Sequence, residues 1–193
     1  MAEDAAKLAS LSTTAAACAR CRLAETRTKV VFGMGSAASP LVFVGEGPGA
    51  QEDATGLPFV GRSGQLLDTL IEQELGVTRS ALYIANIVKC RPPGNRNPLP
   101  DEVEACTPYL EGQLEAIAPA LVVALGAVAG RFLIGPDLQI TSARGKFFET
   151  RFGTVMPTFH PSYGLRQGGS AVTAMRADMV TAKLYLMEHG RWK

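Results

Sequence analysis

The sequence predicts an α/β protein with a mostly parallel sheet and helices on both faces of that sheet. Short apolar runs alternate along the chain with longer segments of helical periodicity, which is the pattern of this fold class. The apolar fraction of 47% is ordinary for a soluble α/β protein. With 193 residues, the chain is long enough to form a stable core without disulfides. We therefore expect one domain over residues 1–193.

The first quarter of the chain is expected to supply a helix, an edge strand and the first core strand. Residues 3–17 are rich in alanine and contain few helix breakers, so they predict a helix. The run Thr28–Phe32 predicts a short edge strand before a turn rich in Gly, Ser and Pro. Residues Leu41–Gly45 form a continuous apolar run, which is typical of a strand buried on both faces.

Helices and strands alternate over the rest of the chain. The apolar residues of 62–75 recur at helical spacing, and Gly76 ends that helix. Residues 82–89 predict the second core strand, with Asn86 as a polar residue in an apolar run. By the same criteria, we expect strands at 120–125, 146–151 and 155–159, and helices at 101–114, 126–134 and 172–188.

A glycine-rich turn after the first core strand is the first candidate for a ligand site. In Gly45-Glu46-Gly47-Pro48-Gly49, three glycines permit close approaches that a β-carbon would forbid. Glu46 lies at the carboxyl end of the strand, where open α/β sheets bind their ligands. Phe59, flanked by glycine turns, follows a second acidic pair, Glu52 and Asp53. The alternative is a βα loop with ordinary turn chemistry.

Polar residues follow three different strands of the predicted sheet. Glu46, Asn86 and His160 each lie at or near a carboxyl end, and those ends point the same way in a parallel sheet. A carboxylate, an amide and an imidazole, with Phe59 as a flat apolar wall, suit the recognition of a nucleobase edge with chemistry beside it. Each residue also has an ordinary structural explanation: strand asparagines often bond a neighbouring loop, and a histidine before proline is often a turn residue.

The chain contains four cysteines: Cys18, Cys21, Cys90 and Cys106. Structural disulfides are disfavoured in a cytosolic protein. Zinc binds four thiolates, although such sites usually show two C-x2-C pairs. One close pair with two distant cysteines suits a [4Fe–4S] cluster at least as well. From the spacing alone, a cluster, a zinc site and unliganded thiols all remain open.

Charge and hydropathy limit the possible partners and cellular location of the protein. Residues 144–193 carry 8 Lys/Arg against 3 Asp/Glu, although the net charge of the whole chain is only +1. This asymmetry permits a local phosphate-binding face, and it is also common on solvated surfaces. No apolar run approaches the ~20 residues of a membrane helix, and the acidic N-terminus does not resemble a secretory signal. We therefore expect a cytoplasmic protein that makes no use of a membrane.

These residues resemble the iron–sulfur-containing family 4 uracil-DNA glycosylases of bacteria and archaea. The resemblance extends from about Cys18 to Arg166, nearly the whole domain. It rests on CARC at 18–21, VVFGMG at 30–35, VGEGPGAQED and GLPFVGRSGQLLD within 44–68, YIANIVKCRPPGNRNPLPDE at 83–102, Cys106, LGAVA at 125–129, RGK at 144–146 and HPSYGLR at 160–166. So many motifs in one order make a chance resemblance implausible.

The resemblance implies a three-layer α/β/α sandwich with a central four-stranded parallel sheet. It also implies hydrolysis of the N-glycosidic bond of deoxyuridine in single- or double-stranded DNA, by a monomer. The implied cofactor is a [4Fe–4S] cluster on the four cysteines. A related branch that traps uracil covalently has an inserted basic loop ending in histidine after the second strand. The segment CRPPGNRNP at 90–98 has no histidine, which favours turnover.

The resemblance also implies roles for single residues in reading the base. The target base must leave the stack to be reached. Phe59 would then stack on it, and Gly47 would let its edge approach the backbone. Asn86 would accept a hydrogen bond from uracil N3–H and donate one to O4, a pattern that cytosine does not match. Glu52, or Asp53 in its place, would crowd C5 and exclude thymine.

Further implied roles concern the reaction and the DNA. His160 would donate a hydrogen bond to uracil O2 as negative charge builds there. Glu46 would stabilise the cationic sugar and orient the attacking water. Leu165 would fill the gap left by the flipped base, although Gly164 stands where the family commonly has a larger residue. The residues expected to contact DNA phosphates are Arg91, Arg144 and Arg166.

Other functions are compatible with the same residues. A non-catalytic iron–sulfur module that binds nucleic acid would use the same cysteines and basic face. A uracil-binding relative with a different base specificity would keep the site and change its selectivity. A zinc or redox protein would use the cysteines alone.

Overall fold

A computed structural model describes residues 2–192 of the chain and shows a sheet in the order β1-β3-β2-β4-β6-β5. Its strands are β1 (Met34–Gly35), β2 (Leu41–Gly45), β3 (Tyr83–Asn86), β4 (Leu121–Leu125), β5 (Phe148–Thr150) and β6 (Gly153–Thr158). The four central strands are mutually parallel. The edge strands β1 and β5 are antiparallel to their neighbours. The expected four-stranded parallel sheet is therefore confirmed as the centre of a six-stranded mixed sheet.

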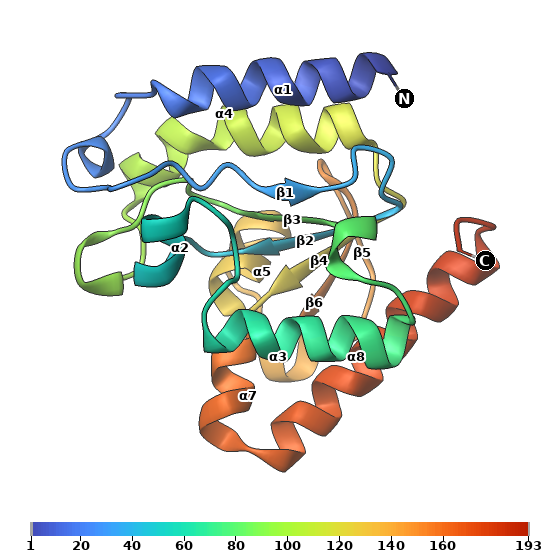
Figure 1. The fold of residues 1–193 in the computed structure, drawn as a ribbon. Helices are drawn as coiled ribbons and strands as arrows, with labels where there is room; N and C mark the ends of the chain where they lie inside the picture. The colour runs from blue at the N-terminus through green and yellow to red at the C-terminus, as the bar shows by residue number, and fades with distance from the viewer. Residues whose placement is uncertain (1, 193) are drawn as a thin grey trace.

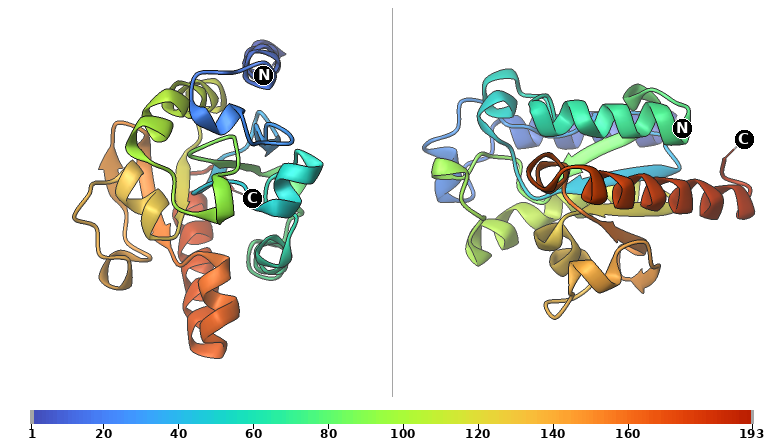
Figure 2. Two further views of the ribbon diagram at one scale, coloured as in Figure 1. Left: turned by 90° about the vertical axis from the view of Figure 1, so that its left-hand side faces the viewer. Right: turned by 90° about the horizontal axis from the view of Figure 1, so that it is seen from below.

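Helices cover both faces of the sheet, so the predicted three-layer arrangement is confirmed. Figure 1 shows α1 (Ala2–Ala16) and α4 (Pro100–Ile117) above the sheet, and α3 (Arg62–Leu70) and α8 (Gly169–Glu188) below it. The right-hand view of Figure 2 shows α3 and α8 side by side on their face. Helix α5 (Ala127–Leu133) packs in the same core as α1 and α4.

Strand alternation divides the interior into two cores. Val42 and Val44 of β2 pack toward α4 and α5, whereas Leu41 and Phe43 pack toward α3 and α8. All four side chains are at most 1% exposed. Because successive side chains of a strand point to opposite faces, a run that is apolar throughout must be covered on both sides. The central strands are thus fixed in position, and their carboxyl ends form one edge of the sheet.

The sequence analysis missed or misplaced several elements near that edge. The short helices α2 (Ala50–Thr55) and α7 (Pro161–Gln167) occupy segments expected to be loops. The prediction of an edge strand at Thr28–Phe32 was wrong, because the edge strand β1 consists of Met34–Gly35. Asp53 Oδ1 accepts the Thr28 N–H at 2.8 Å, so this N–H is not available to a strand ladder. Further short elements are the 3₁₀ turns η1 (Arg22–Ala24), η3 (Arg79–Ala81) and η4 (Pro93–Asn95), the π-helical turn η2 (Ile71–Leu75) after α3, and α6 (Ile140–Ala143).

Within residues 2–192, no helix is both long enough and apolar enough to cross a membrane.

Candidate active site and cysteine pocket

The glycine turn after β2 packs closely against the segment that follows β3. The Ile87 N–H donates to Gly45 O at 2.9 Å, and the Val88 N–H donates to Glu46 O at 3.2 Å. A β-carbon on Gly47 would lie 2.8 Å from a methyl of Val88, so this close approach favours glycine. The sequence prediction that residues from these two strand ends meet is therefore confirmed by the backbone contacts.

Glu46 is half-buried at the carboxyl end of β2. Burial raises the pKa of its carboxyl above the ordinary value, because a low-dielectric environment disfavours the charged form. A carboxylate in such surroundings is a stronger base and interacts more strongly with a nearby positive charge than one in water. Its position suits the stabilisation of a developing cation.

Asn86 and Phe59 come together above Gly45. A β-carbon on Gly45 would lie 2.5 Å from both Asn86 Oδ1 and Phe59 Cζ. Asn86 is 2% exposed and Phe59 is 6% exposed. Asn86 Oδ1 is buried and has no hydrogen-bond partner among residues 2–192. Because buried polar groups are nearly always paired, this oxygen is an acceptor suited to a donor on a ligand.

His160 lies two residues beyond β6 and caps the start of α7. The Ser162 N–H donates to His160 Nδ1 at 3.1 Å, which leaves Nε2 as the protonated nitrogen of the neutral ring. Burial, aided by the positive charge of Arg166, lowers the pKa of His160 to about 4. The His160 and Phe59 ring centroids are 5.8 Å apart. A neutral imidazole thus lies beside the aromatic ring with its Nε2–H available as a donor.

Gly126 makes the position of His160 possible. This glycine follows β4 with φ +92°, in the region that favours glycine, and its N–H donates to Thr158 O at 2.9 Å. A β-carbon there would lie 2.8 Å from His160 Cβ. The structure therefore brings Glu46, Asn86, Phe59 and His160 to one edge of the sheet, the edge that faces the viewer in the left-hand view of Figure 2.

The acidic pair after the glycine turn has backbone partners. Glu52 Oε1 accepts from the N–H groups of Val60 and Gly61, both at 2.9 Å, and Glu52 Oε2 accepts from Gly49 N at 3.2 Å. Asp53 is 4% exposed and binds the backbone near Thr28. Glu52 therefore organises the loop around Phe59, whereas Asp53 holds the backbone at Thr28. The prediction that one of them crowds C5 of a base stays a prediction.

The residues expected to contact DNA lie in three places. Leu165 is 48% exposed on α7, and Arg166 next to it is also exposed. Both belong to the helix that His160 begins, so they flank the candidate site. Arg91 follows Cys90 and donates from Nε to Asn95 Oδ1 at 2.8 Å.

Arg144 does not lie free at this edge. Its guanidinium pairs with Asp178 of α8 at 2.7 Å and also donates to Ala174 O. Asp178 in turn accepts from Thr158 Oγ1 at 2.5 Å. These contacts connect α8 to β6, and they occupy the Arg144 guanidinium with partners inside the protein. A phosphate contact of Arg144 stays a prediction and has no support from these contacts.

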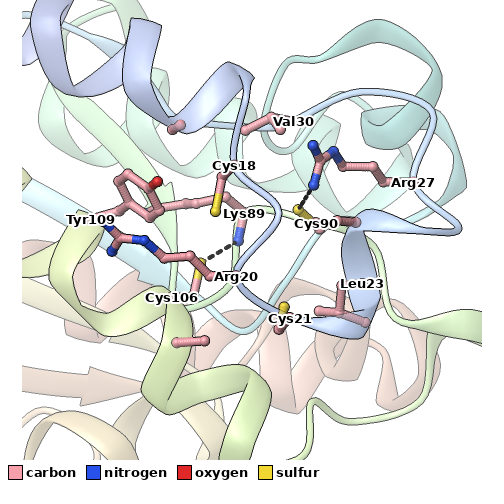
Figure 3. A pocket seen from close by; sticks show the side chains of 13 residues that line it. Cys18, Arg20, Cys21, Leu23, Arg27, Val30, Lys89, Cys90, Cys106 and Tyr109 are labelled. Carbon is pink, nitrogen blue, oxygen red and sulfur yellow. Dashed lines mark hydrogen bonds between the residues drawn. The ribbon is translucent and has the colours of Figure 1, made fainter.

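Four thiols from three parts of the chain line one pocket. Cys18 and Cys21 follow α1, Cys90 follows β3, and Cys106 lies in α4. Figure 3 shows the four sulfur atoms around a common space, with Arg20, Leu23 and Tyr109 among the surrounding side chains. All four cysteines are free, without disulfides. The pocket therefore brings the sulfur atoms of the N-terminal segment close to those of the segment after β3 and of α4.

The chemistry of this pocket fits a polynuclear metal cluster. Cys106 Sγ accepts from the Lys89 N–H at 3.2 Å, and Cys90 Sγ accepts from Arg27 Nη1 at 3.5 Å. Burial raises the pKa of the Cys90 thiol to about 11, so a positive partner is needed to hold it as thiolate. Within residues 2–192, no three His, Cys, Asp or Glu side chains converge on a single ion.

Sequence reasoning missed a buried polar network between the two sites. Lys89 is 1% exposed, and its Nζ donates to Asn86 O at 2.7 Å and to Gln113 Oε1 at 2.6 Å. Gln113 Nε2 donates to Phe32 O and to the Tyr83 hydroxyl. The available signal was a lysine at the end of an apolar strand, because lysine is rarely fully buried without partners.

The fold and the site define the chain as a member of a known class. A sequence model of the family described as "Uracil DNA glycosylase superfamily" matches residues 32–182. The chain therefore belongs to the uracil DNA glycosylase superfamily, as the resemblance predicted.

Curated relatives narrow the comparison to one type. The chain is 46% identical over 176 residues to a type-4 uracil-DNA glycosylase of Thermotoga maritima, covering 90% of this chain and 91% of the relative. It is 44% identical over 153 residues to the type-4 enzyme of Archaeoglobus fulgidus, covering 75% and 76%. The type-4 enzyme of Sulfurisphaera tokodaii is 41% identical over 156 residues, covering 77% and 71%.

Proposed function

We propose that the protein is a DNA repair glycosylase that excises uracil from DNA and leaves an abasic site. The observation that carries this proposal is the buried, unpaired Oδ1 of Asn86 beside the ring of Phe59. An acceptor beside an aromatic ring suits a planar base that has an N–H on its edge. The similarity to type-4 uracil-DNA glycosylases supports uracil as that base.

Base recognition begins when the target nucleotide leaves the helix. Unstacking costs a few kcal/mol, and stacking on Phe59 returns about 1–3 kcal/mol. Asn86 Oδ1 then accepts from uracil N3–H, and Asn86 Nδ2 donates to O4. Cytosine has an unprotonated N3 and an amino group at C4. The acceptor Oδ1 of Asn86 would then face the acceptor N3, and the donor Nδ2 would face the amino group, so neither hydrogen bond could form. Gly47 leaves room for the base edge near the backbone.

The reaction breaks the bond between C1′ and N1 and moves its electron pair onto uracil. His160 donates from Nε2–H to O2, where the negative charge develops, and remains neutral because its pKa is about 4. Glu46 stabilises the positive charge that builds on the sugar. Water adds to C1′ and gives up a proton as it does so, and uracil takes up a proton. The products are free uracil and an abasic site.

The DNA surface is centred on α7. We propose that Leu165 enters the stack in place of the flipped base and that Arg166 contacts a flanking phosphate. Arg91 extends this surface from the loop after β3. We expect the enzyme to act as a cytoplasmic monomer on uracil in single- or double-stranded DNA.

We further propose that Cys18, Cys21, Cys90 and Cys106 bind a [4Fe–4S] cluster. Free thiols in one pocket and N–H donors to two of the sulfurs support a thiolate-bound metal centre, and the single C-x2-C pair favours a cluster over a single zinc ion. The cluster would join three chain segments and supply no electron to the hydrolysis. Iron, sulfide and zinc analysis of purified protein separates the two metals, and stoichiometric zinc without iron would exclude the cluster.

The deciding experiment measures free uracil released from oligonucleotides by cluster-loaded protein. Substrates with uracil, hypoxanthine or thymine opposite guanine are compared, and we expect release of uracil. Asn86→Asp is the matched variant, because a carboxylate accepts from the cytosine amino group. We expect it to excise uracil more slowly and to release some cytosine. Binding of DNA without release of any base by the wild-type protein would favour the non-catalytic module, and preferred release of hypoxanthine or thymine would favour a relative of different specificity.

A further inference from the structure

The Phe59 loop (residues 57–61) has an unusual backbone. Phe59 adopts φ +52°, a left-handed conformation that bulky residues rarely adopt. The ring is nevertheless 6% exposed and lies against Gly45 and near His160. Surrounding contacts must therefore hold the peptide groups of this loop in place.

Contacts hold the loop from two sides. On one side, Glu52 Oε1 accepts from Val60 N–H and Gly61 N–H. On the other side, Arg79 donates from Nη2 to Pro58 O at 2.6 Å and from Nη1 to Phe59 O at 2.9 Å. A carboxylate thus binds the N–H groups after Phe59, and a guanidinium binds the carbonyl groups at and before it.

Arg79 is itself held in a fixed orientation. It begins η3, and its Nη1 also pairs with Asp68 of α3 at 3.0 Å. The Arg79 side chain is 19% exposed, less than that of an ordinary surface ion pair. A β-carbon on Gly64 would lie 1.8 Å from Phe59 O, so the same carbonyl packs directly on α3. The guanidinium therefore reaches two consecutive carbonyls and a carboxylate from one position, which a lysine ammonium on a flexible stem does not reproduce.

We propose that Arg79 is a positioning residue for base recognition, because it fixes the ring of Phe59 at the height and tilt needed to stack on the flipped base. The proposal rests on uracil excision as the function of the site. Arg79 does not touch the base, and it acts only through the backbone of the Phe59 loop. Nothing in the sequence marks it, since it lies 20 residues from Phe59 in a turn between α3 and β3.

The first test compares three variants in steady-state excision of uracil. Arg79→Met keeps the length of the side chain and removes both carbonyl contacts. Stacking is present before and during bond cleavage, so we expect KM to rise roughly tenfold with little change in kcat. Arg79→Lys keeps the charge without the fork, and we expect an intermediate rise. Asp68→Asn removes the ion pair and leaves the carbonyl contacts, so we expect a smaller rise.

Arg176→Met is the matched control. Arg176 lies in α8 and pairs with the carboxylate of Glu74 in η2, so this substitution also removes an arginine from an ion pair, outside the Phe59 loop. We expect its KM to equal that of wild type. Wild-type release of uracil is measured in the same experiment, so failure of the proposed function is seen separately from failure of the role of Arg79.

A double-mutant cycle with Phe59→Ala decides whether Arg79 acts through the ring. If it does, Arg79→Met should add little to KM once the ring is gone. Additive effects, or an unchanged KM in a folded Arg79→Met protein, would overturn the proposal. Should Arg79→Met fail to fold, Arg79→Lys and Asp68→Asn decide: a larger KM rise in Arg79→Lys supports the proposal, and equal effects refute it.

Discussion

At the scale of the residue, the candidate site depends on which polar atoms the protein leaves without partners. Asn86 Oδ1 is unpaired, and His160 has one ring nitrogen engaged by its own helix. Glu52, by contrast, gives both carboxylate oxygens to backbone N–H groups. Whether a polar side chain such as these can bind a ligand therefore depends on whether the neighbouring backbone already occupies its polar atoms.

The buried neutral His160 should make the protein less stable in acid. Its pKa is about 4 in the folded chain against an ordinary 6.5, so the unfolded chain takes up a proton first as the pH falls. Below pH 6.5 the folded state should thus lose stability relative to a His160→Asn variant, by at most about 3 kcal/mol at pH 4. Thermal melts of both proteins at pH 7.5 and pH 4.5 measure this. An equal fall in both melting temperatures would contradict it.

The sequence predicted where the candidate site residues lie in the sheet, because their positions relative to the apolar runs carry that information. Asn86 ends a strand, Glu46 and His160 lie just beyond strands, and the parallel register brings these strand ends together. The sequence did not reveal the hydrogen-bond partners of Glu52 or Arg144, because these depend on side-chain directions across 9 and 34 residues. A charged residue near a site can bind a ligand or stabilise the fold, and only its contacts distinguish the two roles.

At the scale of the element, short helices and glycines place the chemistry. Helix α7 was not predicted, because a seven-residue segment containing Pro161 and Gly164 lacks a periodic apolar face. Pro161 stands at the first helical position, where its missing N–H costs nothing. A β-carbon on Gly164 would lie 3.2 Å from Leu66 and 3.1 Å from Met175, so glycine lets α7 pack tightly there.

Gly126→Ala should reduce activity through His160. The substitution forces alanine to φ +92° and places its methyl 2.8 Å from His160 Cβ, which should cost about 1–3 kcal/mol and displace the imidazole. We expect lower stability and a fall in kcat, measured by melting and uracil release. Gly153→Ala is the control, because that glycine has φ +87° with nothing within 4 Å of the added carbon.

Comparing the two variants separates the effect of backbone strain from the effect of displacing the His160 ring. Gly153→Ala should lose stability to a similar extent while its kcat stays unchanged. Equal kcat values in the two variants would show that His160 tolerates the added methyl and that Gly126 is not needed to position the ring.

At the scale of the whole molecule, the layered core and one edge strand of the sheet were predictable, and the other edge strand was not. Strands apolar on both faces require helices above and below, and four such strands form the parallel centre. The edge strand β1 has 2 residues, too few for any periodicity to show, whereas β5 falls within the strand expected at 146–151. Helix α1 packs on α4, and the two cysteines that follow it meet Cys90 and Cys106 in one pocket.

Removal of the proposed cluster should loosen the N-terminal segment first. Without metal, residues 2–24 would be held mainly by the packing of α1 on α4, whereas the sheet keeps both of its cores. After chelation we expect faster hydrogen exchange in this segment and a lower melting temperature, with exchange in β2 and β4 unchanged. Uniformly faster exchange across the sheet would contradict this, and the untreated protein in the same buffer is the control.

The unpaired oxygen of Asn86 has a consequence for turnover. A buried acceptor without a partner costs about 1–3 kcal/mol, and any ligand with a suitably placed N–H recovers that energy. Uracil retains its N3–H after the glycosidic bond is broken, so the proposed contact of Asn86 with the substrate would also form with the product. The contact that gives selectivity should therefore slow departure of the free base, and added uracil should inhibit the enzyme by competing for the same amide.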